Sequence, residues 1–156
     1  MLSAWSRRFR VGFPHPLIQP GIAVIIRDER GRVLLHLRRD DRGWSPPSGT
    51  VEFGEDLMSA FRREVEEETG LTVACERLIG VYSDPAFQVV DAPDGRRFHW
   101  VTCLFACDRA SGELHGSDEG IEWRWFAPDE LPDGLLPYAV AWLEDGLSPE
   151  GDVVVR

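Results

Sequence analysis

The 156-residue sequence contains no lysine: all 17 basic residues are arginines, and they face 27 aspartates and glutamates. The resulting net charge is −10 with histidine neutral. A protein this acidic has no overall positive field to attract nucleic acids or anionic membranes. The charge therefore excludes nucleic acid polymers and membranes as expected partners. A small phosphorylated ligand fits only where a local positive centre offsets the acid.

The sequence also lacks any run of 18 or more apolar residues, and its first ten residues contain no apolar core typical of a secretory signal. Its three cysteines are an odd number, which does not suit a disulfide framework. Cys103 and Cys107 would lie on one face of a strand about 13 Å apart, too far for one zinc ion. We therefore expect unpaired core thiols and a cytoplasmic protein.

Enough apolar sequence is present for one hydrophobic core, since 43% of the residues are hydrophobic and 10% are aromatic. We expect an N-terminal arm over 1–19, a single domain over 20–146 and a C-terminal tail over 147–156. The arm combines aromatic, apolar and arginine side chains. This composition is compatible with packing against a second copy of the chain, as in a homodimer.

Short apolar runs predict four strands within the domain: 21–27, 33–37, 98–107 and 121–126. The first two strands flank a turn sequence and are expected to form a hairpin. Residues 72–82 are predicted to be mostly extended, with an interruption at Gly80. Helices are predicted at 55–69, ended by Gly70, and at 138–144, with a helical turn at 128–131. This mixture of strands and helices indicates an α/β or α+β domain.

The most informative segment, residues 49–71, holds seven carboxylates in 23 residues. At 100° per residue, one helix face forms an apolar stripe containing Leu57, Ala60, Phe61 and Val65. Glu64 and Glu68 fall inside this stripe, and Glu67 lies at its edge. Carboxylates four residues apart repel each other, and a buried unpaired carboxylate costs several kcal/mol. The three glutamates therefore require a cation, and ligation by oxygen alone favours Mg²⁺ or Mn²⁺.

Gly49, Glu55 and the run from Arg63 to Leu71 follow the spacing G-x5-E-x7-R-E-U-x-E-E-x-G-U, where U is bulky and aliphatic. Every defined position of this pattern is met. The segment resembles a complete Nudix box, and the chain resembles the Nudix hydrolase family.

The resemblance extends over about residues 20–145. Residues 44–49 are similar to the W-x-L-P-G-G sequence that often precedes the box, with departures at Pro46 and Ser48. Residues 122–131 resemble the E-x-x-W-F-x-x-x-E-L sequence that often follows it. Most of the predicted domain is therefore covered by the resemblance.

The resemblance implies an α/β/α sandwich, in which a mixed β-sheet carries the box helix on one face and a C-terminal helix on the other. It implies metal-dependent hydrolysis of the pyrophosphate bond in a nucleoside diphosphate linked to another moiety. ADP-ribose or a nucleotide sugar is the expected substrate, because Pro85 lies near the position of a proline common in ADP-ribose subfamilies. Two alternatives stay open: hydrolysis of an (oxidised) nucleoside triphosphate, and a nucleotide-binding Nudix module without turnover.

Carried over position by position, the implied metal ligands are three carboxylates and one main-chain carbonyl: Glu64, Glu67, Glu68 and Gly49. The resemblance implies that Arg63 holds a box carboxylate and that Glu55 supports the turn before the helix or a second metal through water. Some members of the family draw the general base from the box, which implies Glu67 or Glu68 here. Others use a glutamate of a later loop, for which Glu119 is the candidate, as base or as an extra metal ligand.

Arginine forks bind phosphate in a bidentate manner. The candidates follow the second predicted strand: Arg38, Arg39 and Arg42. Aromatic side chains able to stack on a base are Trp44, Tyr82, Phe87 and Trp100. The alternatives are a solvated arginine loop and aromatics packed in the core. Our expected substrate contacts are Arg38, Arg39, Trp44 and Tyr82.

Overall fold

A computed structural model describes residues 16–40, 43–75, 77–92, 94–107, 110–148 and 151–156. The strands, in chain order, are β1 (Leu17–Ile26), β2 (Val33–Arg38), β3 (Trp44–Ser45), β4 (Ser48–Thr50), β5 (Thr72–Val73), β6 (Arg77–Tyr82), β7 (Val89–Asp91), β8 (Arg97–Cys107), β9 (Ala110–Ser111), β10 (Gly120–Phe126) and β11 (Val154–Val155). The helices are α1 (Leu57–Thr69), α2 (Pro85–Gln88) and α3 (Pro137–Gly146). Most of the predicted N-terminal arm lies outside the described residues, and its last three residues begin β1.

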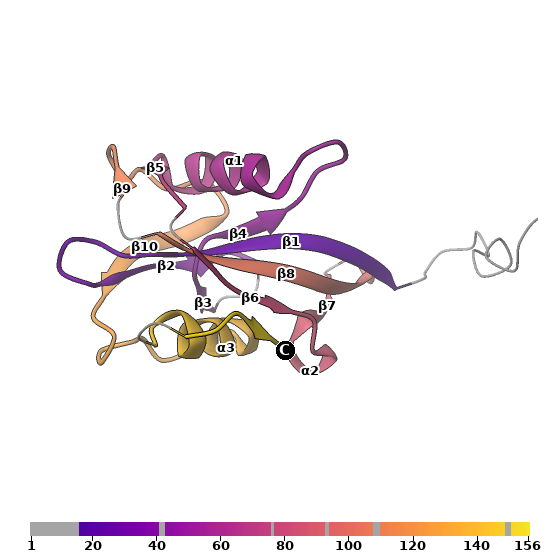
Figure 1. Cartoon of the computed structure of the whole chain (residues 1–156). Helices are drawn as coiled ribbons and strands as arrows, with labels where there is room; N and C mark the ends of the chain where they lie inside the picture. Colours follow the sequence, from indigo (N-terminus) through magenta and orange to yellow (C-terminus); the bar gives the residue numbers. More distant parts are fainter. Residues whose placement is uncertain (1–15, 41–42, 76, 93, 108–109, 149–150) are drawn as a thin grey trace, which may run out of the picture.

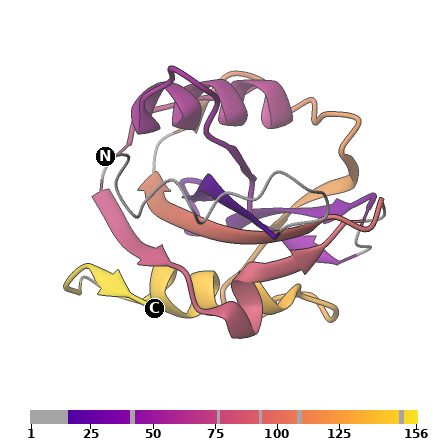
Figure 2. The ribbon, with the colours of Figure 1, turned by 90° about the vertical axis from the view of Figure 1, so that its right-hand side faces the viewer.

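Three layers make up the fold, with α1 on one side of the β-layer and α3 on the other (Figure 1). The view turned by 90° shows the same order of layers (Figure 2). The main sheet runs β11-β6-β8-β1-β4, with β7 also paired to β8, and a second sheet runs β10-β2-β3. β1 lies parallel to β8 from Leu17 to Ile26 and antiparallel to β4. The sheet is therefore mixed, and the predicted sandwich is present.

The hairpin expected from residues 21–37 does not form. An isolated bridge joins Arg27 to Val33 beside the turn, after which β1 and β2 enter different sheets. The physical reason lies in β1, because residues 21–26 are buried without interruption. A strand covered on both faces takes a central position in a sheet. Here β1 reaches that position by pairing in parallel with β8, which is distant in sequence.

Alternate side chains of β1 enter two hydrophobic clusters, one on each face of the sheet. The cluster beneath α1 includes Ile22, Val24, Ile26, Ala60, Phe61 and Val65. The cluster beneath α3 includes Ala23, Ile25, Ile79, Leu104, Trp142 and Leu143. The box helix is thus fixed to the sheet through its apolar stripe.

The box helix begins at Leu57, two residues later than predicted, because Asp56 is its N-cap. The Asp56 carboxylate accepts hydrogen bonds from the main-chain N–H groups of Met58 and Ser59. The helix ends where predicted, since Gly70 takes a left-handed conformation with φ 72°. The prediction that Leu57 belongs to the buried apolar stripe is wrong, since this residue is 40% exposed. A side chain at the first helical residue leans away from the rest of the helix.

The C-terminal segment, expected to be a tail, extends the main sheet instead. Its strand β11 pairs in parallel with β6, and the Arg156 guanidinium donates to Asp145 of α3 at 2.8 Å. The predicted closing helix is present as α3, whereas residues 128–131 form a turn without a helix. The short helix α2 had no counterpart in the predictions.

None of the three cysteines forms a disulfide, and Cys107 is buried while Cys75 and Cys103 are partly buried. Within the described residues, no helix is both long and apolar enough to span a membrane.

Candidate active site

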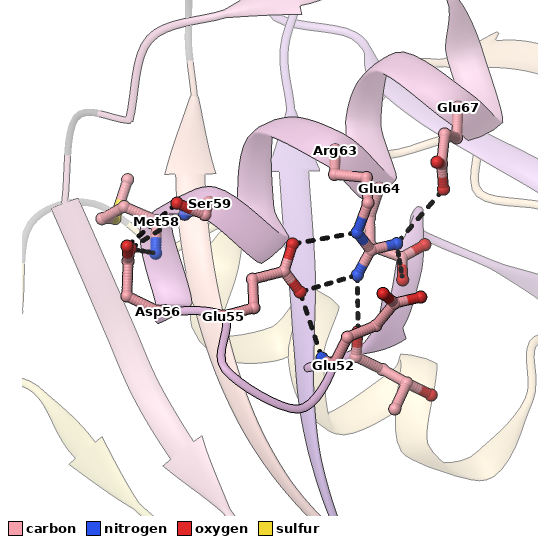
Figure 3. A network of polar contacts seen from close by, with 9 residues as sticks. Glu52, Glu55, Asp56, Met58, Ser59, Arg63, Glu64 and Glu67 are labelled. Carbon is pink, nitrogen blue, oxygen red and sulfur yellow. Dashed lines mark hydrogen bonds and ion pairs between the residues drawn. The ribbon is translucent and has the colours of Figure 1, made fainter.

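Arg63 bonds to the main chain and to three carboxylates near the start of α1 (Figure 3). Its Nε and Nη2 donate to the two oxygens of Glu55, each at 2.9 Å, which is the bidentate geometry of a strong pair. Its Nη1 donates to Glu64 at 2.8 Å and to Glu67 at 3.1 Å. Its Nη2 also donates to the Thr50 carbonyl at 2.9 Å. Arg63 therefore connects the helix to the strand β4 that precedes it.

Glu55 serves the turn between β4 and α1. Its Oε2 accepts the Glu52 main-chain N–H at 3.1 Å, and its own N–H donates to the Glu52 carbonyl at 3.1 Å. The hydrogen bonds from Arg63 lower the pKa of Glu55. The geometry matches the supporting role that the sequence suggests, because every one of these bonds fixes the loop rather than a ligand.

Glu68 is a carboxylate held inside the protein, with 2% of the residue exposed. Its Oε2 accepts the Ser48 main-chain N–H at 3.0 Å, whereas its Oε1 has no hydrogen-bond partner among the described residues. Burial and then the charge of Glu119 raise the pKa of Glu68 to about 8, although the Arg38 charge opposes the shift. An oxygen in this state calls for a positive group.

Glu64 lies directly against the main chain of β4. A Cβ placed on Gly49 would stand 2.0 Å from the Glu64 carboxyl carbon, so only glycine leaves room for this carboxylate. Burial raises the pKa of Glu64 in spite of its bond to Arg63, and the charges of Glu67 and Glu119 act in the same direction. The Gly49 main chain and the Glu64 carboxylate therefore share one site, as the resemblance implies.

Glu119 reaches this site from the loop before β10. It lines one cavity with Glu64 and Gly49, and its charge raises the pKa of both Glu64 and Glu68. Glu67 differs, because its side chain is 63% exposed and bonds to Arg63. The structure thus brings Glu64, Glu68 and Glu119 together and leaves Glu67 at the outer side of the helix.

These donors are of the kind that a divalent cation prefers, although no three acidic, histidine or cysteine side chains in the described residues are gathered closely enough to hold a metal ion. Arg63 binds the carboxylates of Glu64 and Glu67. Among the described residues, the buried Oε1 of Glu68 has no hydrogen-bond partner, and the charges of Glu119 and Glu64 act on this carboxylate along with that of Arg38. Carboxylate and carbonyl oxygens are hard ligands, so the fit is to Mg²⁺ or Mn²⁺ rather than to zinc.

The cavity beside these residues has a volume of about 340 Å³ and two different walls. One wall carries the polar groups of β4, α1 and the loop before β10, including Ser48, Gly49, Glu64 and Glu119. The other wall, from β7, β8, α2 and α3, includes Gln88, Val90, Phe98, Trp100, Tyr138 and Trp142. One cavity therefore offers charged and aromatic surfaces side by side.

The three arginines expected to bind phosphate have different positions. Arg38 lines the cavity and forms two hydrogen bonds to Asp40, at 3.0 and 2.8 Å. Arg39 does not line it, because its Nε donates to the Asp118 carbonyl at 2.9 Å, and it is exposed. Arg42 lies outside the described residues. Arg38 alone among those described is placed to meet a ligand.

Both aromatic residues chosen for base stacking are core residues, so these two predictions are wrong. Trp44 is 9% exposed and packs edge-on against Phe126, with ring centroids 5.0 Å apart. Tyr82 is fully buried and donates its hydroxyl to Asp145 at 2.8 Å. Neither ring has a free face for a base. The strand faces of β3 and β6 point these rings into the cluster beneath α3.

The cavity's aromatic wall comes largely from residues that sequence reasoning did not select. Phe98, Trp100 and Thr102 alternate along β8 and all line the cavity. Their spacing of two residues places them on one face of the strand. The predicted strand over 98–107 contained this signal, and only Trp100 was considered as a ligand contact.

A comparison with known families decides the identity of this fold. The family model described as NUDIX domain matches residues 17–146. The chain belongs to the Nudix family. This Nudix protein is 32% identical over 144 residues to an RNA pyrophosphohydrolase of Novosphingobium aromaticivorans, covering 81% of this chain and 86% of that one. It is 34% identical over 119 residues to an ADP-ribose pyrophosphatase of Methanocaldococcus jannaschii, covering 74% and 66%.

A solved Nudix structure confirms the predicted fold. The crystal structure of a MutT Nudix hydrolase from Burkholderia pseudomallei matches with a TM-score of 0.64 at 30% identity, covering 82% of this chain and 97% of that one. The protein is therefore a Nudix hydrolase, an enzyme of the pyrophosphohydrolase class, and Nudix enzymes in general use divalent cations. The names of the two relatives differ in their substrates, so family membership leaves the substrate to be argued from the site.

Proposed function

We propose that this Nudix hydrolase cleaves the pyrophosphate bond of a nucleoside diphosphate linked to another moiety, with ADP-ribose or a nucleotide sugar as substrate. The observation that carries the proposal is the single cavity with an acidic wall and an aromatic wall. A cation at the acidic wall suits a diphosphate, and the aromatic wall suits a flat base. The two halves of such a substrate would thus meet surfaces of matching chemistry.

Mg²⁺ or Mn²⁺ is the proposed cofactor, held by Glu64, Glu68 and the Gly49 carbonyl, with Glu67 available from the outer side of the helix. When bound, the cation supplies positive charge for the phosphate oxygens and lowers the pKa of water. The free Oε1 of Glu68 supports its assignment as a ligand. Arg63 keeps the carboxylates of Glu64 and Glu67 in place through its two bonds from Nη1.

Glu119 is the proposed general base. In the hydrolysis, a water oxygen bonds to phosphorus, the bridging P–O bond breaks and the Glu119 carboxylate accepts the water proton. Its place in the cavity beside Glu64 supports this role. Arg38, which lines the same cavity, is proposed to donate to a phosphate oxygen.

The proposed contact for the base is the pair formed by Trp100 and Phe98. Their ring centroids lie 6.0 Å apart with the planes tilted by 35°, and both rings line the cavity. Both residues are partly exposed, so each ring keeps surface for a ligand. These rings replace Trp44 and Tyr82 in the proposal.

The proposal is tested by measuring hydrolysis of ADP-ribose, nucleotide sugars, nucleoside triphosphates and a 5′-triphosphorylated RNA oligonucleotide. Nucleoside monophosphate is detected for the first two, and pyrophosphate release for the triphosphates and the RNA. Each is assayed with Mg²⁺, with Mn²⁺ and with EDTA. We expect turnover of a nucleoside diphosphate derivative that EDTA abolishes. Glu64→Gln should lower this turnover at least a hundredfold, whereas Glu66→Gln, on the exposed side of the same helix, should not.

Other outcomes separate the remaining readings. Hydrolysis confined to triphosphates would favour the nucleoside triphosphate alternative, and hydrolysis confined to RNA would overturn the proposed exclusion of nucleic acids. No turnover of any compound would indicate a binding module. A cytoplasmic location is part of the proposal, since three cysteines without a disulfide suit a reducing compartment.

A further inference from the structure

The loop that carries Glu119 is fastened to the end of β2 by Arg39. The Arg39 main-chain N–H donates to the Glu119 carbonyl at 2.9 Å. The Arg39 Nε donates to the neighbouring Asp118 carbonyl, also at 2.9 Å. The guanidinium thus binds loop main chain rather than the cavity, where the sequence had suggested a phosphate contact.

The same loop rests on a pair of aromatic rings, Trp123 and His36. A Cβ on Gly116 or on Gly120 would stand 2.5 Å from the Trp123 indole, so both glycines allow the main chain to lie directly on this ring. Trp123 in turn packs on the fully buried ring of His36, with centroids 4.3 Å apart. The loop is therefore held at its two ends by Trp123 and along its middle by Arg39.

This restraint opposes an electrostatic force. Glu119 is exposed and lines the cavity beside Glu64, where its charge acts on Glu64 and Glu68. Like charges repel, and a carboxylate on an unrestrained loop would turn toward water. A main chain fixed on both sides keeps the Glu119 side chain within reach of the site.

We propose that Arg39 is a positioning residue, which holds the Glu119 carboxylate facing Glu64 and Glu68 before the substrate binds. The inference rests on the proposed function, in which Glu119 accepts the proton of the attacking water. This role differs from phosphate binding, because the Arg39 guanidinium donates to the Asp118 carbonyl and not to the substrate. Loss of the fork should affect the reaction step and leave substrate affinity nearly unchanged.

The kinetic test is a double-mutant cycle. Arg39→Ala should lower kcat about tenfold with KM within about twofold, because the base is misplaced while the phosphate contacts remain. In the Glu119→Gln background the same substitution should change kcat less than twofold. Arg32→Ala is the matched control, since Arg32 pairs with Asp28 next to the other end of β2 and should leave kcat unchanged.

The structural test is amide hydrogen exchange of the metal-free protein. Arg39→Ala should speed exchange of the Arg39 and Gly120 amides about tenfold, because these amides bond to loop carbonyls. Gly116→Ala, which displaces the loop from Trp123, should give the same acceleration and the same fall in kcat. Arg32→Ala should leave this exchange unchanged.

Three results would overturn the proposal: unchanged exchange in Arg39→Ala, a rise in KM with kcat unchanged, or equal kcat losses in the wild-type and Glu119→Gln backgrounds. Wild-type protein that hydrolyses no compound of the panel is a separate failure. Faster exchange in Arg39→Ala would then leave the loop restraint in place, while the proposed function and the role of Arg39 in it would both fall.

Discussion

Replacing Glu68 by glutamine should make the metal-free protein more stable and less responsive to Mg²⁺. Glutamine has nearly the same shape, and its side-chain oxygen can still accept the Ser48 N–H, which lies 3.0 Å from the Glu68 carboxylate. The substitution removes the ionisable group, which in the metal-free fold is stable only when protonated. If Glu68 stabilised the fold by itself, the variant would be less stable than the wild type. If the carboxylate serves to bind a cation, the variant should be more stable when the cation is absent.

The magnitude follows from the pKa of Glu68, which burial raises from 4.5 to about 8. A carboxylate with a raised folded-state pKa contributes its full stability below pH 4.5 and loses it as the pH rises toward 8. At about 1.4 kcal/mol per pH unit, the wild type loses about 3 kcal/mol at pH 7 and under ~1 kcal/mol at pH 5. An unpaired amide nitrogen in the variant costs about 1 kcal/mol. Glu68→Gln should therefore gain about 2 kcal/mol at pH 7 and nothing at pH 5.

Urea unfolding in EDTA at pH 5 and pH 7 measures this difference, with Glu66→Gln as the neutral control on the exposed side of α1. Added Mg²⁺ should stabilise the wild type by linkage and the variant much less. A variant less stable than the wild type at pH 7 in EDTA would refute the argument. Equal gains at both pH values would refute it as well, since the effect would then not come from the charge.

Further expectations concern three other residues. Arg63→Lys keeps the charge but loses the fork, so kcat and Mn²⁺ affinity should each fall at least tenfold; activity within threefold of wild type would contradict this. Burial lowers the pKa of His36 to about 3, so stability should fall by about 1.4 kcal/mol per unit below pH 6.5, and urea titrations of His36→Gln should lack this slope. Trp100→Ala should raise KM about tenfold with little change in kcat; an unchanged KM would exclude base stacking there.

Local patterns predicted the box helix and its end at Gly70, and they placed its start two residues too early. A stripe of period 3.6, an acidic N-cap and a terminal glycine are properties of neighbouring residues, and α1 obeys them from Asp56 to Gly70. The partners of β1 were not predictable in this way. Its buried run indicates a central strand, but which strand lies beside it depends on β8, far along the chain.

The site shows the same contrast between local patterns, which were predictable, and contacts between distant parts of the chain, which were not. The spacing of the box placed Glu64 and Glu68 on the buried side of α1, because one helix fixes both. Trp44 and Tyr82 were misjudged, since residue type alone does not say which face of a strand a ring occupies. Arg39 was recognised as a fork, but its partner is a carbonyl of a loop that only the folded chain brings near.

The parallel pairing of β1 with β8 also determines when the site can form during synthesis. Leu17 pairs with Phe98, so the centre of the sheet closes only after about 80 further residues have been made, a separation typical of slow folding. The box helix lies between these strands and is complete earlier. The acidic side of the cavity that the box helix supplies is therefore synthesised before the wall that carries Phe98 and Trp100.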